Sequence, residues 1–446
     1  MENRMSWLIE KYARLLHEDY VKAHESLVVS IRSILYSRFY KVAPIRVVKQ
    51  EKPVVFVDSG IFTESTNVSS LTLMRLGAIV REENGRLVTL AHYSGKPSAK
   101  SIETLIVYSN IGWDGLIPVF KFSIEPVDEH SLLFNEGDTD RVSREVSWII
   151  NRGIKESFEI KKPGQSPRKV ARYLMNIHKY IISMLEVAYL ARILEFISDG
   201  IGVVDGSLQR WFGVKYAGMP PVDGFSILSV LSGVGKSKLK EILIDKVTGL
   251  TKTSSLTSLA SAYSLFMGNS IVSKSGAYGY VDSESAGNAA TVLKEIVEKM
   301  GVDLGREAAA VFNRIVFQKR DEVELWRFRV PVASEGFQRI FHAEYYIDKP
   351  IITVSSSGVK VNEDLAGKLG EKAHYTVNQV FSKVSGISGT PPYGLMEVDR
   401  MVRLDRDKSR VYHEVLILAL RRAVGRGNHP LIQAFEASLR MRYGYR

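Results

Sequence analysis

The 446-residue sequence contains no cysteine. Without thiols the chain can form no disulfide bond, no thiolate metal site and no cysteine nucleophile. Any metal site must therefore use Asp, Glu or His, and carboxylate-rich sites suit the hard ions Mg²⁺ and Mn²⁺.

Long hydrophobic runs are also lacking. No apolar run reaches the roughly 18 residues that a membrane-spanning helix needs, and the N-terminal residues have no apolar signal core. Hydrophobic residues make up 45% of the chain and charged residues 24%, which is ordinary for a globular protein. We therefore expect a cytoplasmic protein that does not bind a membrane.

Acidic residues are fewer than basic residues. The chain has 60 Lys and Arg against 49 Asp and Glu, a formal net charge of +11. Such an excess favours polyanionic partners, nucleic acids above all. Many basic proteins bind no nucleic acid, so the charge alone does not decide the function.

Two apolar runs each end in an aspartate followed by Gly and Ser. Ile201–Leu208 reads Ile-Gly-Val-Val-Asp-Gly-Ser-Leu, and Pro53–Gly60 reads Pro-Val-Val-Phe-Val-Asp-Ser-Gly. Unbroken apolar runs are typical of strands covered on both faces. In open α/β sheets, ligands bind beyond the carboxyl ends of such strands, where Asp58 and Asp205 would lie. Either aspartate alone could be a turn residue, but the pair favours a functional site.

Hydrophobic spacing predicts the other elements. Three- and four-residue spacing predicts helices over 5–40, 139–154 and 168–197, and a mainly helical end from 395. Strands are predicted over 70–81, 86–92, 101–108, 116–124, 224–232, 325–332 and 343–354. Asn84-Gly85 is a strong hairpin signal, so residues 60–125 are expected to form antiparallel sheet attached to the first strand.

Glu186 is a third candidate site residue, within the predicted helix 168–197. Its neighbours on the helix face are Ile182, Tyr189, Leu190 and Ile193. A carboxylate in this apolar stripe needs a partner, either a metal ion or a hydrogen-bonding Arg or Tyr. Glu195, by contrast, lies on a solvated face.

The late segment 391–404 carries the last candidate acids. Asp399 has apolar residues on its helical face, whereas Glu397 lies beside Arg400 and could form a surface ion pair. We therefore prefer Asp399 as a site residue.

The order of these features resembles the ribonuclease H fold. In that fold, distant carboxylates surround two divalent ions, which stabilise the attacking and leaving oxygens of a phosphodiester displacement. We therefore expect an α/β protein with a ribonuclease H-like mixed sheet flanked by helices, an enlarged insertion and helical termini. A helical segment over 1–50 would precede a nuclease domain over 51–446, with the β-rich insertion at about 60–165.

At these residues the sequence resembles the NurA nuclease family. The similar motifs are Val57-Asp58-Ser-Gly60, Met184-Leu-Glu186 and Val204-Asp205-Gly-Ser-Leu208. Leu250–Leu256, which contains Lys252, is similar to a Gly/Lys/Ser-containing strand of the family. Pro391–Arg400 is similar to its C-terminal aromatic segment. The matches span nearly the whole chain in the family's order.

The resemblance implies a Mn²⁺-dependent DNA nuclease, with Mg²⁺ possible and two ions in the site. Asp58, Glu186, Asp205 and Asp399 would hold the metal, and Lys252 would lie near the scissile phosphate. The implied reactions are 5′-to-3′ exonuclease and single-strand endonuclease cleavage, in DNA end resection during archaeal double-strand break repair. The implied partners are DNA, a second copy of the chain in a homodimer, and the hexameric HerA ATPase.

Two positions depart from the family's motifs. The first motif reads Asp-Ser-Gly where the family has Asp-Gly-Ser, which leaves the aspartate in place. Asp399 stands where the family has a histidine; it can bind a metal but cannot act as a neutral imidazole. This change motivates an alternative, a weakened or inactive NurA-like DNA-binding subunit of an ATPase complex.

Three basic segments have other possible roles. Ser232–Lys238 contains Gly-Lys-Ser, but a P-loop needs Gly where Val230 stands, so we prefer a basic loop to an ATP site. Ser273–Tyr280 is either a turn or a surface that stacks on unpaired bases. Lys161–Lys169 is either a linker or a loop that contacts phosphates.

Overall fold

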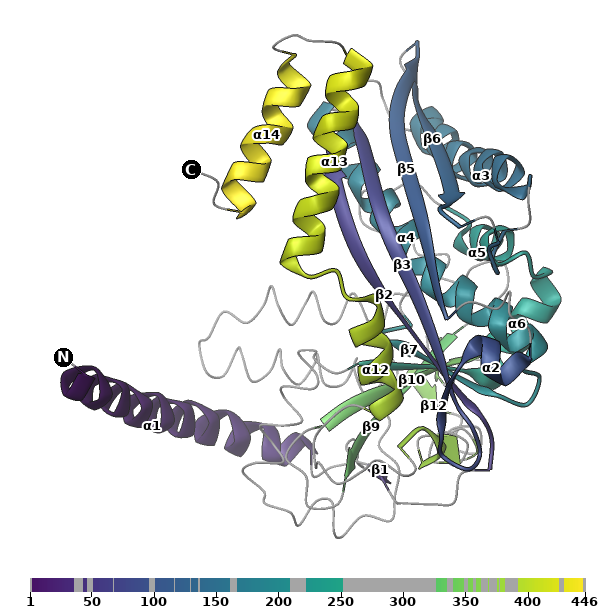
Figure 1. The fold of residues 1–446 in the computed structure, drawn as a ribbon. Helices are drawn as coiled ribbons and strands as arrows, with labels where there is room; N and C mark the ends of the chain where they lie inside the picture. Colours follow the sequence, from purple (N-terminus) through teal and green to yellow (C-terminus); the bar gives the residue numbers. More distant parts are fainter. Residues whose placement is uncertain are drawn as a thin grey trace.

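One large mixed sheet organises the chain in the computed structural model (Figure 1). The structure describes residues 2–35, 43–45, 51–160, 167–208, 222–251, 326–361, 368, 375–381 and 392–443, with short gaps inside these ranges. Within them the sheet has ten strands in the order β1-β9-β10-β8-β7-β2-β3-β5-β6, and β4 pairs with β3. The predicted α/β class, a mixed sheet flanked by helices, is confirmed.

Most strands lie close to the predicted runs, but the hydrophobic spacing did not predict β1 and β8. The strands of the sheet are β1 Ala43–Ile45, β2 Val54–Ser65, β3 Ser69–Arg81, β4 Leu87–Thr89, β5 Ile102–Asp114, β6 Ile117–Pro126, β7 Ile201–Asp205, β8 Val247–Thr251, β9 Trp326–Ser334 and β10 Ile340–Ile347. β11 (Ile352–Ser355) and β12 (Gly358–Val361) form a separate pair. The hairpin turn is confirmed, because Asn84 Oδ1 accepts the Arg86 N–H at 2.7 Å and Gly85 adopts φ 84°.

Five neighbouring strands form the centre of the sheet, in the order β5-β3-β2-β7-β8. β3 is antiparallel to both of its neighbours, β2 and β5, as predicted for residues 60–125, while β7 is parallel to both β2 and β8. This order and these directions are those expected for a ribonuclease H-like sheet. β6 extends it on one side, and β10, β9 and β1 extend it on the other.

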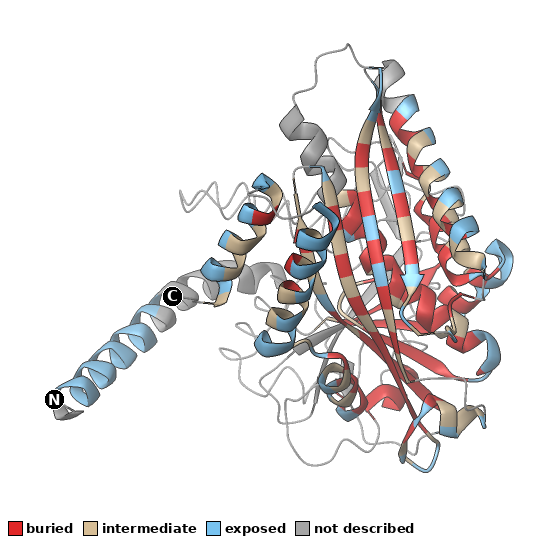
Figure 2. Cartoon of the chain, turned by 45° about the horizontal axis from the view of Figure 1, so that its top comes forward, coloured by how far each residue is buried: buried red, intermediate tan, exposed pale blue. Residues whose placement is uncertain are grey.

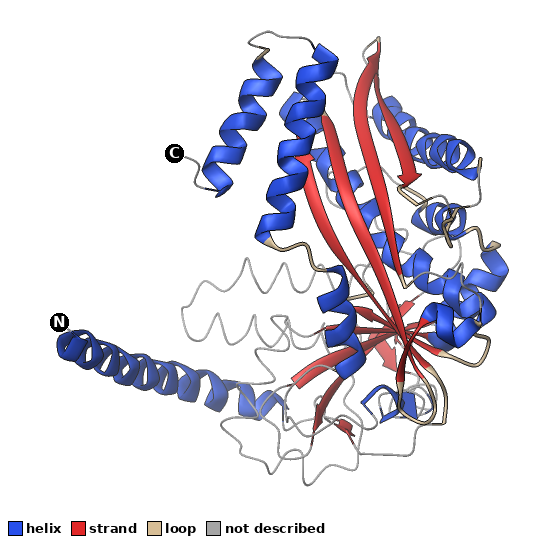
Figure 3. Ribbon diagram, in the orientation of Figure 1, coloured by secondary structure: helices blue, strands red, loops and turns tan. Residues whose placement is uncertain are grey.

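Helices cover both faces of this sheet (Figure 3). The described helices are α1 Glu2–Leu35, α2 Leu90–Ser94, α3 Asp138–Ile160, α4 Pro167–Phe196, α5 Gly224–Ser232, α6 Lys236–Lys246, α12 Tyr393–Val402, α13 Arg406–Val424 and α14 Pro430–Tyr443. Of these, α1 does not cover the sheet but extends away from it (Figure 1). In Figure 1, α4 lies behind the sheet and α12 in front of it. None of the helices in the described ranges is long and apolar enough to span a membrane.

One predicted strand is wrong, and another is too long. Residues 224–232 form helix α5, whose N-cap Asp223 accepts the Ser226 N–H at 3.0 Å. A short apolar run without alternation is compatible with either element, and here the cap decides. The predicted strand 86–92 stops at Thr89, because the Thr89 side chain caps the short helix α2.

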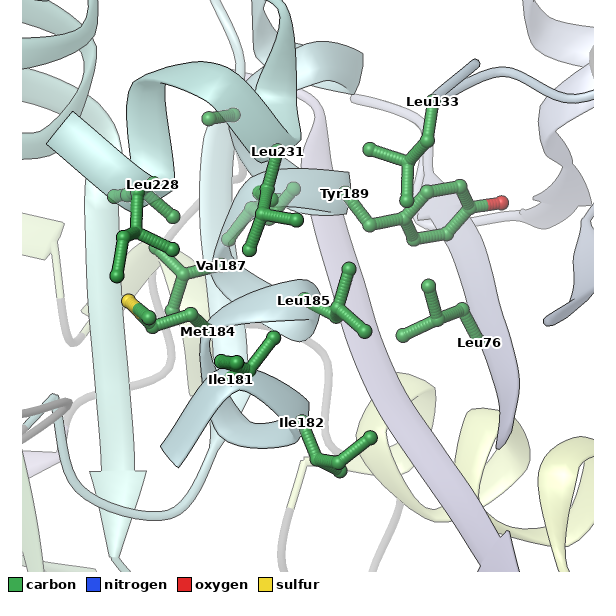
Figure 4. Close-up of a cluster of buried hydrophobic side chains, with 14 of the residues drawn as sticks. Leu76, Leu133, Ile181, Ile182, Met184, Leu185, Val187, Tyr189, Leu228 and Leu231 are labelled. Atoms are coloured by element: carbon green, nitrogen blue, oxygen red, sulfur yellow. The ribbon is translucent and has the colours of Figure 1, made fainter. Parts of the chain in front are cut away.

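The main core lies between the sheet and α4. α4 is buried on most sides because α5 and α6 cover the side that faces away from the sheet. In Figure 4, Met184 and Leu185 of α4 lie among Leu228 and Leu231 of α5 and Leu76 of β3. The alternation of buried and exposed residues along β5 and β6 is visible in Figure 2, and it places one face of these strands against the core.

A buried carboxylate anchors the C-terminal helices to β2. Glu64, at the far end of β2, lies 2.5 Å from Arg442 of α14 and 3.1 Å from Nδ1 of His413 of α13. The His413 ring also contacts the rings of Phe62 and Phe435. A buried carboxylate needs such partners, so the positions of α13 and α14 depend on β2 reaching as far as Glu64.

A second buried polar network crosses β2, β3, β5 and α4. Thr63 Oγ1 lies 2.7 Å from Thr72 Oγ1, which lies 2.7 Å from His178 Nε2. His178 Nδ1 lies 2.8 Å from Ser109 Oγ. Burial lowers the pKa of His178 from 6.5 to about 4, because the low-polarity surroundings disfavour the charged imidazolium.

This shift predicts a pH dependence of stability. Because the folded-state pKa of His178 is depressed, its contribution is full above pH 6.5 and is lost as the pH falls through about 4. The wild-type free energy of unfolding should therefore drop by up to about 3 kcal/mol more than that of His178→Gln over this window. Urea titrations at a series of pH values measure the difference.

The matched control is His92→Gln, at an exposed position on α2. That variant should keep the wild-type pH profile. Identical profiles for wild type and His178→Gln would contradict the prediction.

Candidate functional site

Asp58 lies in the middle of a strand and not at its end. β2 continues through Ser59 and Gly60 to Ser65 and pairs with β3 throughout. The predicted turn after Asp58 is therefore wrong, since the antiparallel partner keeps the backbone extended. On its other side, β2 pairs with β7 only from Val54 to Val57. Asp58 thus lies level with the end of the parallel part of the sheet.

Asp58 and Asp205 lie side by side on neighbouring strands. The parallel pairing of β2 with β7 ends at Val57 and Val204, and Asp58 and Asp205 are the residues that directly follow this last pair. Residues in register on neighbouring strands share a face, so both carboxylates point to the same side of the sheet. β7 ends at Asp205 and Gly206 adopts φ 91°, so the predicted turn there is confirmed.

Helix α12 covers this face through a close packing of glycines. Asp58 pairs across the strands with Gly77, and a Cβ on Gly77 would meet the Val402 and Val398 side chains at 2.4 and 2.9 Å. Gly60 faces the Val402 backbone, and Gly394 of α12 faces the Phe56 ring. Asp58 lies between these contacts and is only 8% exposed.

Glu186 reaches β2 from the opposite side. The Ser59 hydroxyl donates a hydrogen bond to Oε1 of Glu186 on α4. Because successive residues of a strand face opposite sides, Ser59 points to the α4 face and Asp58 to the α12 face. The sequence left a metal, Arg or Tyr open as partner of Glu186; the structure gives it a serine.

The surroundings of Glu186 match the predicted stripe. Ile182, Tyr189, Leu190 and Ile193 are all buried, whereas Glu186 is half-buried. Glu195 is on the solvated face, as expected, and pairs with Arg192 at 2.5 Å.

A buried glutamate that the sequence did not reveal holds the turn after Asp205. Oε2 of Glu344 on β10 accepts the Ser207 hydroxyl at 2.9 Å and the Leu208 N–H at 3.0 Å. The Tyr346 hydroxyl donates to the Leu208 carbonyl at 2.7 Å. Hydrogen bonds to a carboxylate are among the stronger ones, so Glu344 fixes the backbone that follows Asp205. The one available signal was an acid within a β-like run.

The remaining candidates are placed differently. Asp399 Oδ2 accepts from Arg403 Nη2 at 2.7 Å, and its side chain is 38% exposed. Glu397 lies 3.3 Å from Arg400, which confirms the ion pair expected as its alternative role. Lys252 lies outside the described residues, directly after β8.

These carboxylates only partly fit a metal centre. Asp58 and Asp205 offer hard oxygen ligands on one face, which suits Mg²⁺ or Mn²⁺. Among the described residues, however, no three His, Asp or Glu side chains are grouped so that they could hold a metal ion. Glu186 is bonded on the α4 face of β2, so the described chain offers a pair of aspartates and not a complete cluster.

The Ser232–Lys238 loop lacks the architecture of a P-loop. It joins two helices, α5 and α6, whereas a P-loop follows a strand. Lys236 Nζ lies 3.8 Å from Asp223 of α5. This supports the basic-loop interpretation over an ATP site. Ser273–Tyr280 and residues 161–166 lie outside the described residues, and 167–169 begin α4.

Comparison with known proteins gives weak likenesses. The sequence matches no family model and no curated protein. The NurA nuclease from Sulfolobus solfataricus has a TM-score of 0.40 and 10% identity, over 96% of this chain and 99% of its own. NurA bound to dAMP and manganese has a TM-score of 0.30 and 12% identity, over 93% and 98%. Such values do not establish the family, so the function depends on the chemistry of this chain's own residues.

The packing of α12 predicts an effect of adding one methyl group. Gly77→Ala should lower the free energy of unfolding by about 1–3 kcal/mol, because the new Cβ overlaps Val398 and Val402. Urea denaturation measures the change. Gly112→Ala on β5 is the matched control, since no atom lies within 4 Å of its Cβ position. Equal stabilities of the two variants would show that α12 does not pack this closely.

Proposed function

We propose that the protein is a metal-dependent nuclease that hydrolyses phosphodiesters in DNA. The observation that carries the proposal is the pair Asp58 and Asp205, side by side on one face where the parallel strands end. Two carboxylates that lie close together repel each other, and a divalent cation bound by both offsets this repulsion. A divalent cation is the partner that fits such a pair and a negatively charged phosphodiester substrate.

The side chains around the aspartate pair have different parts in this proposal. Asp58 and Asp205 supply the cation ligands, and Glu344 holds the turn that follows Asp205. Glu186, beside Ser59, is a further acid close to the same point of β2. When bound, a divalent ion offsets charge on the phosphate and activates water.

DNA is the proposed polymer because the chain is strongly basic and its motifs resemble those of NurA nucleases. The net charge of +11 favours a polyanion. The same resemblance motivates Mn²⁺ as the preferred ion, 5′-to-3′ exonuclease and single-strand endonuclease activity, and a role in end resection. A homodimer and a HerA-type hexameric ATPase are the proposed protein partners.

One observation favours a second candidate, a DNA-binding subunit without catalysis. The third acid, Glu186, lies on the α4 face and is bonded to Ser59, and the described residues group no three ligands. A protein of this kind binds DNA and a partner ATPase but cleaves nothing with Mn²⁺ or Mg²⁺.

The first test replaces the paired aspartates. Asp58→Asn and Asp205→Asn should each lower cleavage at least about 100-fold, because the neutral amide is a far weaker ligand for a hard cation. Cleavage of end-labelled single- and double-stranded DNA is measured over a Mn²⁺ and Mg²⁺ series.

The matched control is Asp199→Asn, an exposed acid just before β7, which should cleave as wild type does. Unfolding temperatures show that the variants fold. Undiminished cleavage by either site variant would remove the aspartate pair from the mechanism. DNA binding by the wild type without any cleavage would identify the non-catalytic subunit instead.

Asp399 provides a separate test of the resemblance. As a proposed metal ligand it should be sensitive to charge removal, so Asp399→Asn should lower cleavage at least about 10-fold. Arg403→Gln removes the partner of the same ion pair and should leave cleavage near the wild-type rate. If both variants behave alike, Asp399 serves only the surface ion pair, whose expected value is below about 1 kcal/mol.

A further inference from the structure

One tryptophan stands exposed in the middle of helix α3. Trp148 is 63% exposed, although a Trp side chain is normally largely buried. The opposite side of α3 packs against β6 through Val142, Val146, Ile150 and Ile154, which are all buried. Trp148 therefore points away from the sheet.

Hydrogen bonds fix this orientation of α3. Ser147 Oγ accepts the Phe122 N–H at 2.9 Å. Asn151 pairs with both backbone groups of Phe120, at 2.7 and 2.8 Å. These contacts to β6 prevent α3 from turning about its axis to bury the indole, so the exposed Trp148 is built into the fold.

Two arginines bracket Trp148 on the same face. Arg144 lies four residues before it and Arg152 four residues after it, and both are exposed. Four residues of α-helix rise about 6 Å, so the two arginines start about one turn before and one turn after Trp148. The Arg152 guanidinium carbon lies 5.9 Å from the Trp148 ring centroid, and Arg144 Nε contacts the Asp140 carbonyl oxygen at 3.3 Å.

The composition of this face distinguishes between classes of partner. Protein-binding hot spots place a Trp at the centre of a well-packed patch that excludes water. On α3, Trp148 is the one exposed large hydrophobic residue among those whose burial is described. Arg144 and Arg152 are its neighbours at four residues, and the acid Glu145 at three residues is paired with Arg141 at 3.3 Å. An aromatic ring between cations matches a single-stranded nucleic acid, which offers a base plane and flanking phosphates.

We propose that Arg144, Trp148 and Arg152 form a stacking site for one unpaired base of a single-stranded nucleic acid. The base lies on the exposed indole, and the guanidinium groups contact the phosphates on either side. The proposal rests on the proposed function only for the class of polymer, since stacking on α3 requires no cleavage. It places a strand contact on α3, away from the aspartate pair.

The test measures binding of a short fluorescein-labelled oligothymidylate to the full chain in EDTA, where metal-dependent cleavage is absent. Trp148→Ala should weaken binding roughly 5- to 100-fold, because stacking on an aromatic side chain contributes strongly per base. Trp113→Ala is the matched control, since Trp113 on β5 is 50% exposed and should not matter. Thermal unfolding confirms that both variants fold.

A second ligand, which lacks bases, distinguishes the contribution of base stacking to binding from that of the phosphate charge. On a strand of abasic nucleotides, wild type and Trp148→Ala should bind equally weakly. Arg144→Gln and Arg152→Gln should weaken binding to both strands and flatten its salt dependence. Wild-type affinity of Trp148→Ala for oligothymidylate, or an equal loss on the abasic strand, overturns the site.

The outcomes remain separable from those of the nuclease proposal. A protein that binds through Trp148 and never cleaves keeps the stacking site and loses the nuclease. A protein that cleaves normally and is indifferent to Trp148→Ala keeps the nuclease and loses the stacking site.

Discussion

Strand β2 has partners of different length on its two edges, and the candidate site depends on that difference. Antiparallel β3 accompanies β2 from Val54 to Ser65, whereas parallel β7 accompanies it only to Val57. The long pairing keeps the backbone extended through Asp58, and the short pairing brings Asp205 beside it at the end of β7. A strand that stopped at Asp58 would not reach Glu64, to which α13 and α14 are anchored.

The two faces of β2 then receive different helices. α12 approaches closely because Gly60, Gly77 and Gly394 have no side chains to keep it away. α4 packs on the other face and brings Glu186 to Ser59. Asp58 therefore lies on the α12 face of β2, where it is buried, and Glu186 contacts the next residue of the strand, Ser59, on the α4 face.

Buried polar contacts determine where these elements pack, although their net contribution to the free energy of folding is modest. Glu344, His178 and Glu64 are each buried with hydrogen-bonding or charged partners from other elements. The net gain from such contacts is modest, but leaving one partner unpaired is costly. They therefore select one register and one docking position. In the same way, hydrogen bonds from Ser147 and Asn151 to β6 determine the orientation of α3, and this orientation leaves Trp148 exposed to solvent.

The sequence by itself determined the fold class, most element positions and the two aspartate-ended runs, because periodicity and turn residues are local signals. The helix in 224–232 was missed because its apolar run has no period, and the cap at Asp223 settled it.

Only the tertiary structure decided which side chains meet. Strand register set Asp58 beside Asp205, the alternation of faces separated Asp58 from Glu186, and β10 supplied Glu344 from 139 residues after Asp205 (344 − 205). Contacts between residues so far apart in the chain depend on pairing and packing, and no local pattern in the sequence encodes them.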